Sequence, residues 1–169
     1  FQMGYKDTGF SSKGMDSLMR EVSVKILLEM IMGRSSKLYN KLYNEGLINN
    51  SFEFDYSIEE TYAYSSFVGE SRDPIKVKDM VLEEITSLQQ TGLEMETYER
   101  IRRAHKGRFV KQLNSVERIA HHFVSVYFKE VNLFDYMEVY DKISFEYVNK
   151  IFKEHFTADK LAMSVIKPA

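Results

Sequence analysis

The sequence predicts an α+β fold in which helices pack on one face of a mixed, mainly antiparallel β-sheet. Two short segments alternate apolar and polar residues, as half-buried strands do. Longer segments repeat apolar residues at helical spacing, and the two kinds come in separate runs: strand, two helices, two strands, several helices, strand. This order favours α+β over α/β. The 169 residues, with no repeat or linker, predict one domain spanning 1–169.

The first half of the chain supplies three expected strands and two helices. The expected elements are a strand at Phe1–Tyr5, helices at Lys13–Met32 and from Ser35 or Ser36 to Tyr43, and strands at Ser51–Ser57 and Tyr62–Gly69. Apolar residues cover more than half the circumference of Lys13–Met32, so we expect a central, buried helix. Gly33 can end it, a serine can cap the short helix that follows, and Gly46 can terminate that helix.

The two central strands are expected to form a hairpin with one aromatic-rich face. In the second strand, Tyr62 and Tyr64 share a face with Ser66 and Val68, opposite Ala63 and Phe67. The aromatic series is Phe52, Phe54, Tyr56, Tyr62 and Tyr64. We interpret it as a sheet face covered by helices, with a peptide-binding sheet edge as the alternative.

The second half is expected to be helical until a last strand. The expected elements are a helix from Asp73-Pro74 to Gly92, helices at Met95–Leu113, Ser115–Lys129, Leu133–Asp141 and Phe145–Phe156, and a strand at Lys160–Lys167. Asp73 suits the N-cap and Pro74 the first helical position. Asn114 with Glu117 has capping-box spacing, and Asn132 with Asp135 approximates it.

Composition excludes several classes of protein. The net charge is −2 with no basic block, so we expect no nucleic-acid partner. There is no cysteine, which excludes disulfides and thiolate metal sites and fits a cytoplasmic protein. The most apolar stretch, Val22–Met32, is charged in places and too short to span a membrane. The chain opens on Phe1 in a strand-like segment, so we expect a fragment of a longer polypeptide.

Residues 33–48 are the most informative stretch, with the sequence GRSSKLYNKLYNEGLI. They follow a strongly apolar helical segment and precede the expected hairpin. This turn, with its serine pair and Leu-x-x-Glu-Gly-Leu, resembles the C-terminal, non-zinc-binding domain of pitrilysin-type (insulinase, mitochondrial processing peptidase) zinc metallopeptidases. The resemblance runs essentially from Phe1 to Pro168. It implies the fold of a pitrilysin-type half-domain.

The resemblance also implies which chemistry lies outside this chain. Zinc in this family is held by His-x-x-Glu-His on a helix, where the glutamate is the general base. The histidines here are His105, His121, His122 and His155, and no two have that spacing. Glu117 and His121 could touch at i, i+4, which we interpret as an ordinary hydrogen bond. We therefore expect no catalytic residue, metal or cofactor in this chain, and zinc in a homologous N-terminal domain.

Two positions of the family motif correspond to substrate-binding residues and are replaced here. The family's Arg and Tyr contact the substrate and help to stabilise the oxyanion. Tyr43 lies where the Arg is expected, and the closing Tyr falls at Asn49, or at Asn50 without a one-residue deletion. A phenol offers no charged, bidentate fork. Tyr39 and Tyr43, four residues apart, are also interpreted as one packed apolar face.

The implied function is that of a scaffold and peptide-chamber domain, inactive as a peptidase by itself. The partners implied are the N-terminal domain, a second subunit in a homo- or heterodimer, and a peptide substrate. Two alternatives stay open: a non-catalytic subunit that pairs with a separate active peptidase, and a purely structural assembly protein. The 12 Phe and 11 Tyr residues are numerous for one small domain, and we expect some of them at such contacts.

Overall fold

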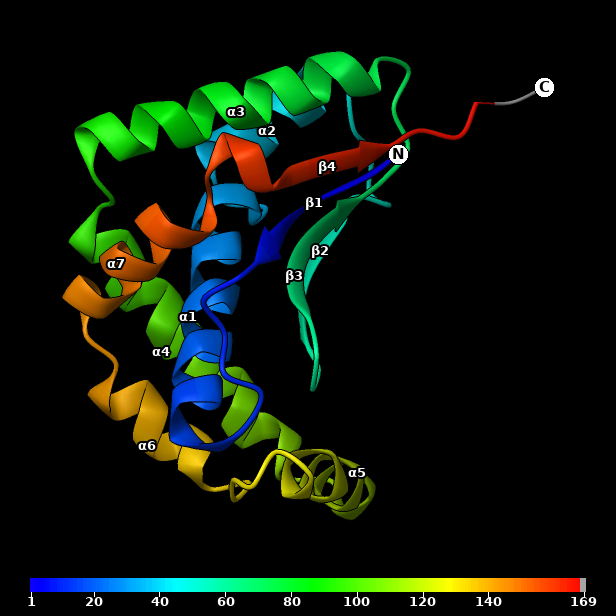
Figure 1. Cartoon of the computed structure of the whole chain (residues 1–169). Coiled ribbons are helices and arrows are strands. Elements are labelled where there is room, and N and C mark those ends of the chain that lie inside the picture. Colours follow the sequence, from blue (N-terminus) through cyan, green and yellow to red (C-terminus); the bar gives the residue numbers. More distant parts are fainter. Residues whose placement is uncertain (168–169) are drawn as a thin grey trace.

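A four-stranded antiparallel sheet forms one layer of the computed structural model, which describes residues 1–167 (Figure 1). Its strands are β1 (Gln2–Asp7), β2 (Glu53–Ile58), β3 (Ala63–Val68) and β4 (Leu161–Ser164). The strand order is β2-β3-β1-β4. The α+β class is confirmed, and within residues 1–167 each strand pair is antiparallel, so the sheet is not mixed.

Seven helices make up the rest of the described chain. They are α1 (Gly14–Met32), α2 (Lys37–Asn44), α3 (Pro74–Thr91), α4 (Met95–Gln112), α5 (Val116–Tyr127), α6 (Asp135–Lys142) and α7 (Phe145–His155). A short 3₁₀ turn, Ala158–Lys160, precedes β4. Figure 1 shows α1, α4, α6 and α7 on one side of the sheet, while the other face is open. Among these helices none is long and apolar enough to cross a membrane.

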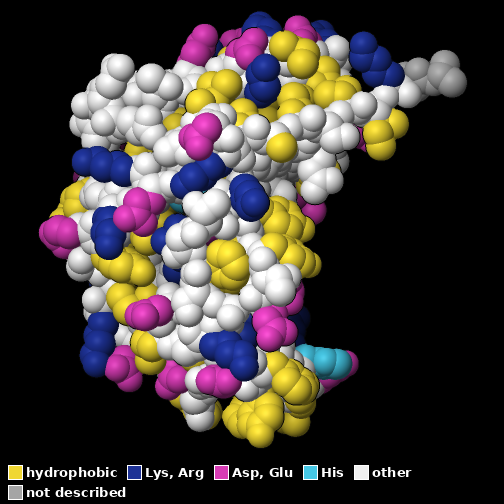
Figure 2. Space-filling view, in the orientation of Figure 1, with side chains coloured by type: hydrophobic (Ala, Val, Ile, Leu, Met, Phe, Trp, Pro, Cys, Tyr) yellow, Lys and Arg dark blue, Asp and Glu magenta, His cyan; other side chains and the backbone are white. Residues whose placement is uncertain are grey.

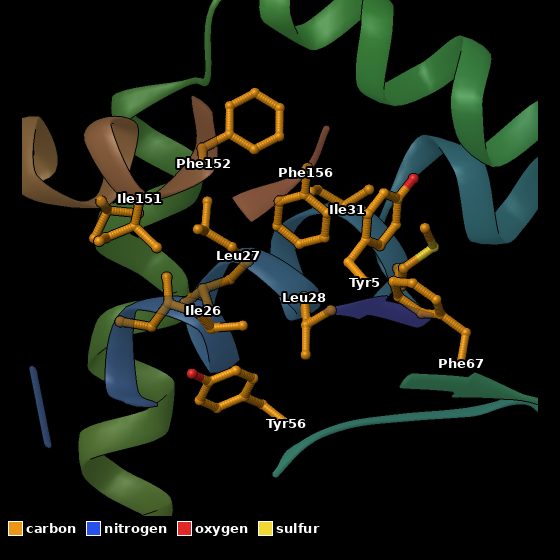
Figure 3. Packing of buried hydrophobic residues seen from close by; sticks show 14 of the residues in the cluster. Tyr5, Ile26, Leu27, Leu28, Ile31, Tyr56, Phe67, Ile151, Phe152 and Phe156 are labelled. Carbon is orange, nitrogen blue, oxygen red and sulfur yellow. The ribbon is translucent and has the colours of Figure 1, made fainter. Parts of the chain in front are cut away.

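Helix α1 is the centre of the core, as its apolar circumference predicts. It contacts β2 and the helices α2, α4, α6 and α7. Its side chains Ile26, Leu27 and Leu28 are almost completely buried and pack against Phe152, Phe156 and the inner face of the sheet (Figure 3). Polar residues of α1 are buried as well, namely Ser17, Arg20, Glu21 and Ser23. Each side of this helix therefore meets protein.

The open face of the sheet corrects one expectation. On β3, Ala63, Ser65 and Phe67 point inward, so strand alternation turns Tyr64 outward. Tyr62 and Tyr64 are exposed, and their rings stack on each other with centroids 6.0 Å apart. The prediction of a helix-covered aromatic face is therefore wrong for these two residues. It is right for Phe52 and Tyr56, which are buried, and Phe54 is partly buried.

Several element ends differ from the expected ones for local reasons. Ser115, not Asn114, caps α5, because its Oγ accepts a hydrogen bond from Arg118 N. The last strand ends at Ser164 rather than at residue 167, since Ser164 pairs with Gln2, the first residue of β1. The caps expected at Ser36 and Asp73 are confirmed.

An ion cluster links α1 to α4 and predicts acid sensitivity. Glu29 lies 3.2 Å from His105 Nε2 and accepts a 2.8 Å hydrogen bond from Arg108 Nη2. The hydrogen bond with His105 and the charge of Arg108 outweigh burial and lower the pKa of the Glu29 carboxyl to about 2. A lowered folded-state pKa means that the stabilisation is present above the unfolded pKa and is lost as pH falls towards 2.

We expect Glu29→Gln to cost about 1–2 kcal/mol at neutral pH and almost nothing near pH 2, after allowance for solvent screening. Urea denaturation of both proteins between pH 7 and pH 2 measures this difference. Glu138→Gln removes an exposed i, i+4 ion pair with Lys142 and serves as the control. A Glu29→Gln deficit that does not change across this range would contradict the prediction.

Candidate functional site

The motif at residues 33–48 folds as helix α2 and a tight C-terminal turn. Ser36 Oγ accepts from Tyr39 N at 3.0 Å and caps the helix. At the other end Gly46 has φ +65°, which favours glycine, and its N–H donates to Tyr43 O. The N–H of Leu47 donates to Leu42 O, which completes a Schellman motif, and both leucines are buried. The Glu-Gly-Leu sequence thus has a local structural cause.

Tyr43 lies on the last turn of α2 with 45% of its side chain exposed. Its ring stacks on Tyr39, with centroids 6.0 Å apart and planes at 11°. Tyr39 is buried and packs in turn against Phe52, which lies just before β2. One face of the Tyr43 ring is therefore held by the core. The expected packing of Tyr39 with Tyr43 is confirmed.

Asn49 lies in the loop between α2 and β2, after the turn at Gly46. Its Nδ2 donates to Glu70 Oε2 at 3.0 Å, and its Oδ1 accepts from Ser51 N at 2.8 Å. These bonds tie the loop to the segment that follows β3. Tyr43 and Asn49 both flank the same turn, but each is engaged with different neighbours.

Two cations from the segment after β3 hold this turn. Arg72 Nη2 donates to the carbonyl of Glu45 at 2.7 Å, and Lys76 Nζ lies 2.8 Å from the Glu45 carboxylate. A cation at the C-terminus of a helix complements its dipole. This part of the molecule therefore presents a stacked phenol, Tyr43, and a hydrogen-bonded amide, Asn49, beside the turn.

The histidines do not come together. His105 contacts Glu29, His121 is exposed on α5, His122 packs edge-on against Phe109, and His155 is buried. Within residues 1–167 no group of three or more His, Cys, Asp or Glu side chains could hold a metal ion. Zinc needs three or four such ligands in tetrahedral geometry, so the donors described here do not fit it.

A buried polar cluster, which the sequence does not reveal, joins five elements. Asp7 of β1 accepts hydrogen bonds from Arg20 Nε at 2.8 Å and Nη2 at 2.6 Å, and from Tyr56 Oη at 2.8 Å. His155 of α7 lies 3.5 Å from Asp7 through Nδ1 and 2.8 Å from Ser65 Oγ through Nε2. We call these five residues the Asp7 cluster.

Charge complementarity fixes the ionisation of the Asp7 cluster. Burial alone raises the pKa of the Asp7 carboxyl, but the contacts with His155, Arg20 and Tyr56 outweigh it and hold that pKa well below its usual range. Burial and the Asp7 charge raise the pKa of the Tyr56 phenol above its usual range. Asp7 is therefore a carboxylate and Tyr56 a neutral donor at neutral pH.

In space, Ser65, His155 and Asp7 lie one after another, as the serine, histidine and aspartate of a hydrolytic triad do. A nucleophilic serine must meet a substrate carbonyl and an oxyanion site. Ser65 and His155 have no exposed surface, and Ser65 lies on the inner face of the sheet beneath α7. A substrate could reach Oγ only if the helix layer separated from the sheet. We assign the cluster a structural role.

The comparisons with known proteins identify the family. Residues 8–104 match the family model described as the peptidase M16 inactive domain. The chain belongs to the M16 peptidase family. The zinc protease YmfH of Bacillus subtilis (strain 168), itself uncharacterised, is 33% identical over 98% of this chain. The resemblance to pitrilysin-type peptidases carried by residues 33–48 is thereby confirmed.

Solved structures of M16-like proteins share the fold. A candidate M16-like peptidase from Alicyclobacillus acidocaldarius has a TM-score of 0.89 at 22% identity, over 95% of this chain and 38% of its own. The inactive peptidase domain of a candidate zinc protease from Bordetella parapertussis has a TM-score of 0.76 at 11% identity, over 95% of this chain and 87% of its own. With the match of residues 8–104 to the inactive-domain model, this chain is an inactive-type M16 C-terminal domain that has the fold of these structures.

The chain is much shorter than most of these relatives. It spans 39% of YmfH and 38% of the Alicyclobacillus protein. The M16 domain described here is comparable in extent with the inactive domain from Bordetella parapertussis.

Proposed function

We propose that this chain is the C-terminal scaffold and peptide-chamber domain of a longer M16 protein, in which an N-terminal homologous domain holds zinc. The match to the inactive-domain model carries this proposal. Residues 1–167 contain no group of side chains that could hold a metal ion, and the open sheet face offers exposed polar and aromatic side chains to a peptide. Its other face is filled by helices and cannot line a chamber.

Tyr43 and Asn49 are proposed as weak substrate contacts of this domain. Both flank the Schellman turn on rigid supports, because Tyr43 stacks on Tyr39 and Asn49 bonds to Glu70. Neither can supply the positive charge of the family's arginine to an oxyanion. A second candidate function follows from this replacement: a non-catalytic subunit that forms a heterodimer with a separate active peptidase.

We expect the purified chain to bind no stoichiometric zinc and to cleave no unstructured peptide, and Tyr43→Arg to create no activity. The attacking water requires a metal site that this domain does not build. Elemental analysis after dialysis and a fluorogenic peptide assay test both points. Chelator-sensitive cleavage that disappears in a His121→Ala, His122→Ala variant would sink the proposal.

A second experiment distinguishes between the two candidate functions. The longer polypeptide that contains this chain should bind one zinc and cleave peptides by itself if the first candidate holds. If the second holds, it should do neither until an active M16 subunit is added. Equal activity with and without that subunit excludes the non-catalytic role.

A further inference from the structure

Helix α5 carries an apolar surface that the described chain leaves uncovered. Val126 is the one buried residue among residues 116–127. The exposed apolar side chains of α5 and the next residue, with their exposed fractions, are Val116 (84%), Phe123 (45%), Val124 (57%), Tyr127 (68%) and Phe128 (72%). Figure 2 shows hydrophobic side chains gathered at the lower end of the molecule, where α5 lies in Figure 1. Other exposed apolar residues are spread over several elements.

Three of these exposed residues, together with Ala120, have the spacing of a coiled-coil seam. Val116, Ala120, Phe123 and Tyr127 are separated by four, three and four residues, which places them in one stripe along the helix. We call these four residues the α5 seam. The helix attaches to its own domain through a different stripe, which includes Ile119 and Val126. Apolar residues therefore cover more of the circumference of α5 than its attachment to the domain requires.

We propose that the α5 seam is an interface between two copies of this chain, with the two α5 helices antiparallel about a two-fold axis between residues 120 and 123. In this register Ala120 lies against Phe123 of the other copy, and Val116 against Tyr127. Each layer then combines a small and a large side chain, which fills space evenly. A parallel register would put two alanines in one layer and two tyrosines in another, leaving a void beside a crowded layer.

The area available fits a dimer of modest affinity. The seam with Val124 and Phe128 offers about 500 Å² of apolar surface per copy, or about 1,000 Å² in all, near the lower limit for specific interfaces. A groove beside the helix, lined by Phe123, Tyr127, Phe128 and Val131, is open to receive apolar side chains of the other copy. The Lys13–Glu130 ion pair lies at its rim. We expect dissociation in the micromolar range.

Sedimentation across a concentration series tests whether the α5 seam forms a dimer. The wild-type chain should pass from monomer to dimer, and Val116→Glu or Tyr127→Glu should weaken the dimer at least tenfold. Val116 lies on the first turn of α5, where an acidic residue suits the helix, so this variant should fold. Ile75→Glu is the control, because Ile75 is also an exposed apolar residue, at 54%, on the first turn of a different helix, α3. Circular dichroism confirms that each variant is folded.

Cysteine crosslinking tests the register, since the natural chain has no cysteine. Ala120→Cys should form an intermolecular disulfide, because the two copies of residue 120 flank the axis. Val116→Cys should not, since the antiparallel register separates its two copies by about 16 Å along the helix, beyond disulfide reach.

Crosslinking by Val116→Cys would overturn the antiparallel pairing, whether or not Ala120→Cys also crosslinks, because only a parallel register brings the two copies of residue 116 together. A chain that stays monomeric at the highest concentration reached would overturn the dimer. The α5 seam would then be covered by something else, such as the remainder of a longer polypeptide.

Discussion

Replacing Arg20 by methionine is expected to lower the free energy of unfolding by about 3–5 kcal/mol, because it leaves the Asp7 carboxylate buried without its cation. The Arg20 side chain is 6% exposed and that of Asp7 is fully buried, so water cannot replace the lost partner. Methionine keeps the unbranched apolar stem of the side chain and removes the guanidinium, so the loss reports mainly the missing charge and its hydrogen bonds. Chemical denaturation at neutral pH, followed by circular dichroism, measures it.

The pH dependence of this loss and an exposed ion pair used as a control both test the prediction. The wild-type protein gains stability from the lowered pKa of Asp7 only above the unfolded value of about 4, and it loses that stability progressively as pH falls below that value. The deficit of Arg20→Met should therefore shrink below about pH 4. Lys13→Met breaks an ion pair of similar length, 2.8 Å, whose partners are 49% and 66% exposed. It should cost less than about 1 kcal/mol. Equal losses of unfolding free energy in the two variants would mean that burial does not determine how much the Arg20–Asp7 ion pair matters for stability.

Replacing Phe67 by alanine is expected to cost about 3–5 kcal/mol, as large-to-small changes in a filled core do. Phe67 has no exposed surface on the central strand β3, and its ring meets Tyr5 edge-on with centroids 6.3 Å apart (Figure 3). The cavity left behind would lie between the sheet and the helices, where both layers are fixed.

Val68→Ala is the matched control for this change. Val68 is the next residue of β3 and points to the open face, where 42% of it is exposed. Its truncation should cost less than about 1 kcal/mol. Similar losses at both positions in urea titrations would contradict the assignment of the two sheet faces.

The sequence places Phe67 and Val68 on opposite faces of the sheet, because strand side chains alternate with a period of two. It did not show which face the helices cover: the expected covered face was that of Tyr62 and Tyr64, which Val68 shares, and the structure leaves that face open. The caps at Ser36 and Asp73 follow from the sequence, since a side-chain oxygen satisfies free N–H groups three residues away. These features depend on neighbours within a few residues. The predicted cap at Asn114 is wrong because the adjacent Ser115 has similar capping chemistry, and only the fold shows which of the two side chains reaches the free N–H groups of α5.

The Asp7 cluster could not be predicted, since its members are brought together by the fold. In the sequence, Arg20 only interrupts an otherwise apolar helix. In the fold, its guanidinium donates to the Asp7 carboxylate. Glu21 is a similar case: Tyr136 Oη donates to it at 3.2 Å from α6, and Lys129 Nζ lies 3.1 Å away. The candidate functional site likewise has one part that the sequence predicts and one part that it does not. The turn at Gly46 follows from the sequence, whereas the bond between Asn49 and Glu70 depends on how two loops meet.

The position of β1 in the sheet has a consequence for folding during synthesis. β1 leaves the ribosome before the other strands, yet it is central and pairs with β3 on one side and with β4 on the other. Met3 must wait for Met163 before that second edge is satisfied. Such long-range pairing is slow and leaves an unpaired strand open to other chains. A nascent domain stalled before β4 is therefore the species from which aggregation is expected to begin.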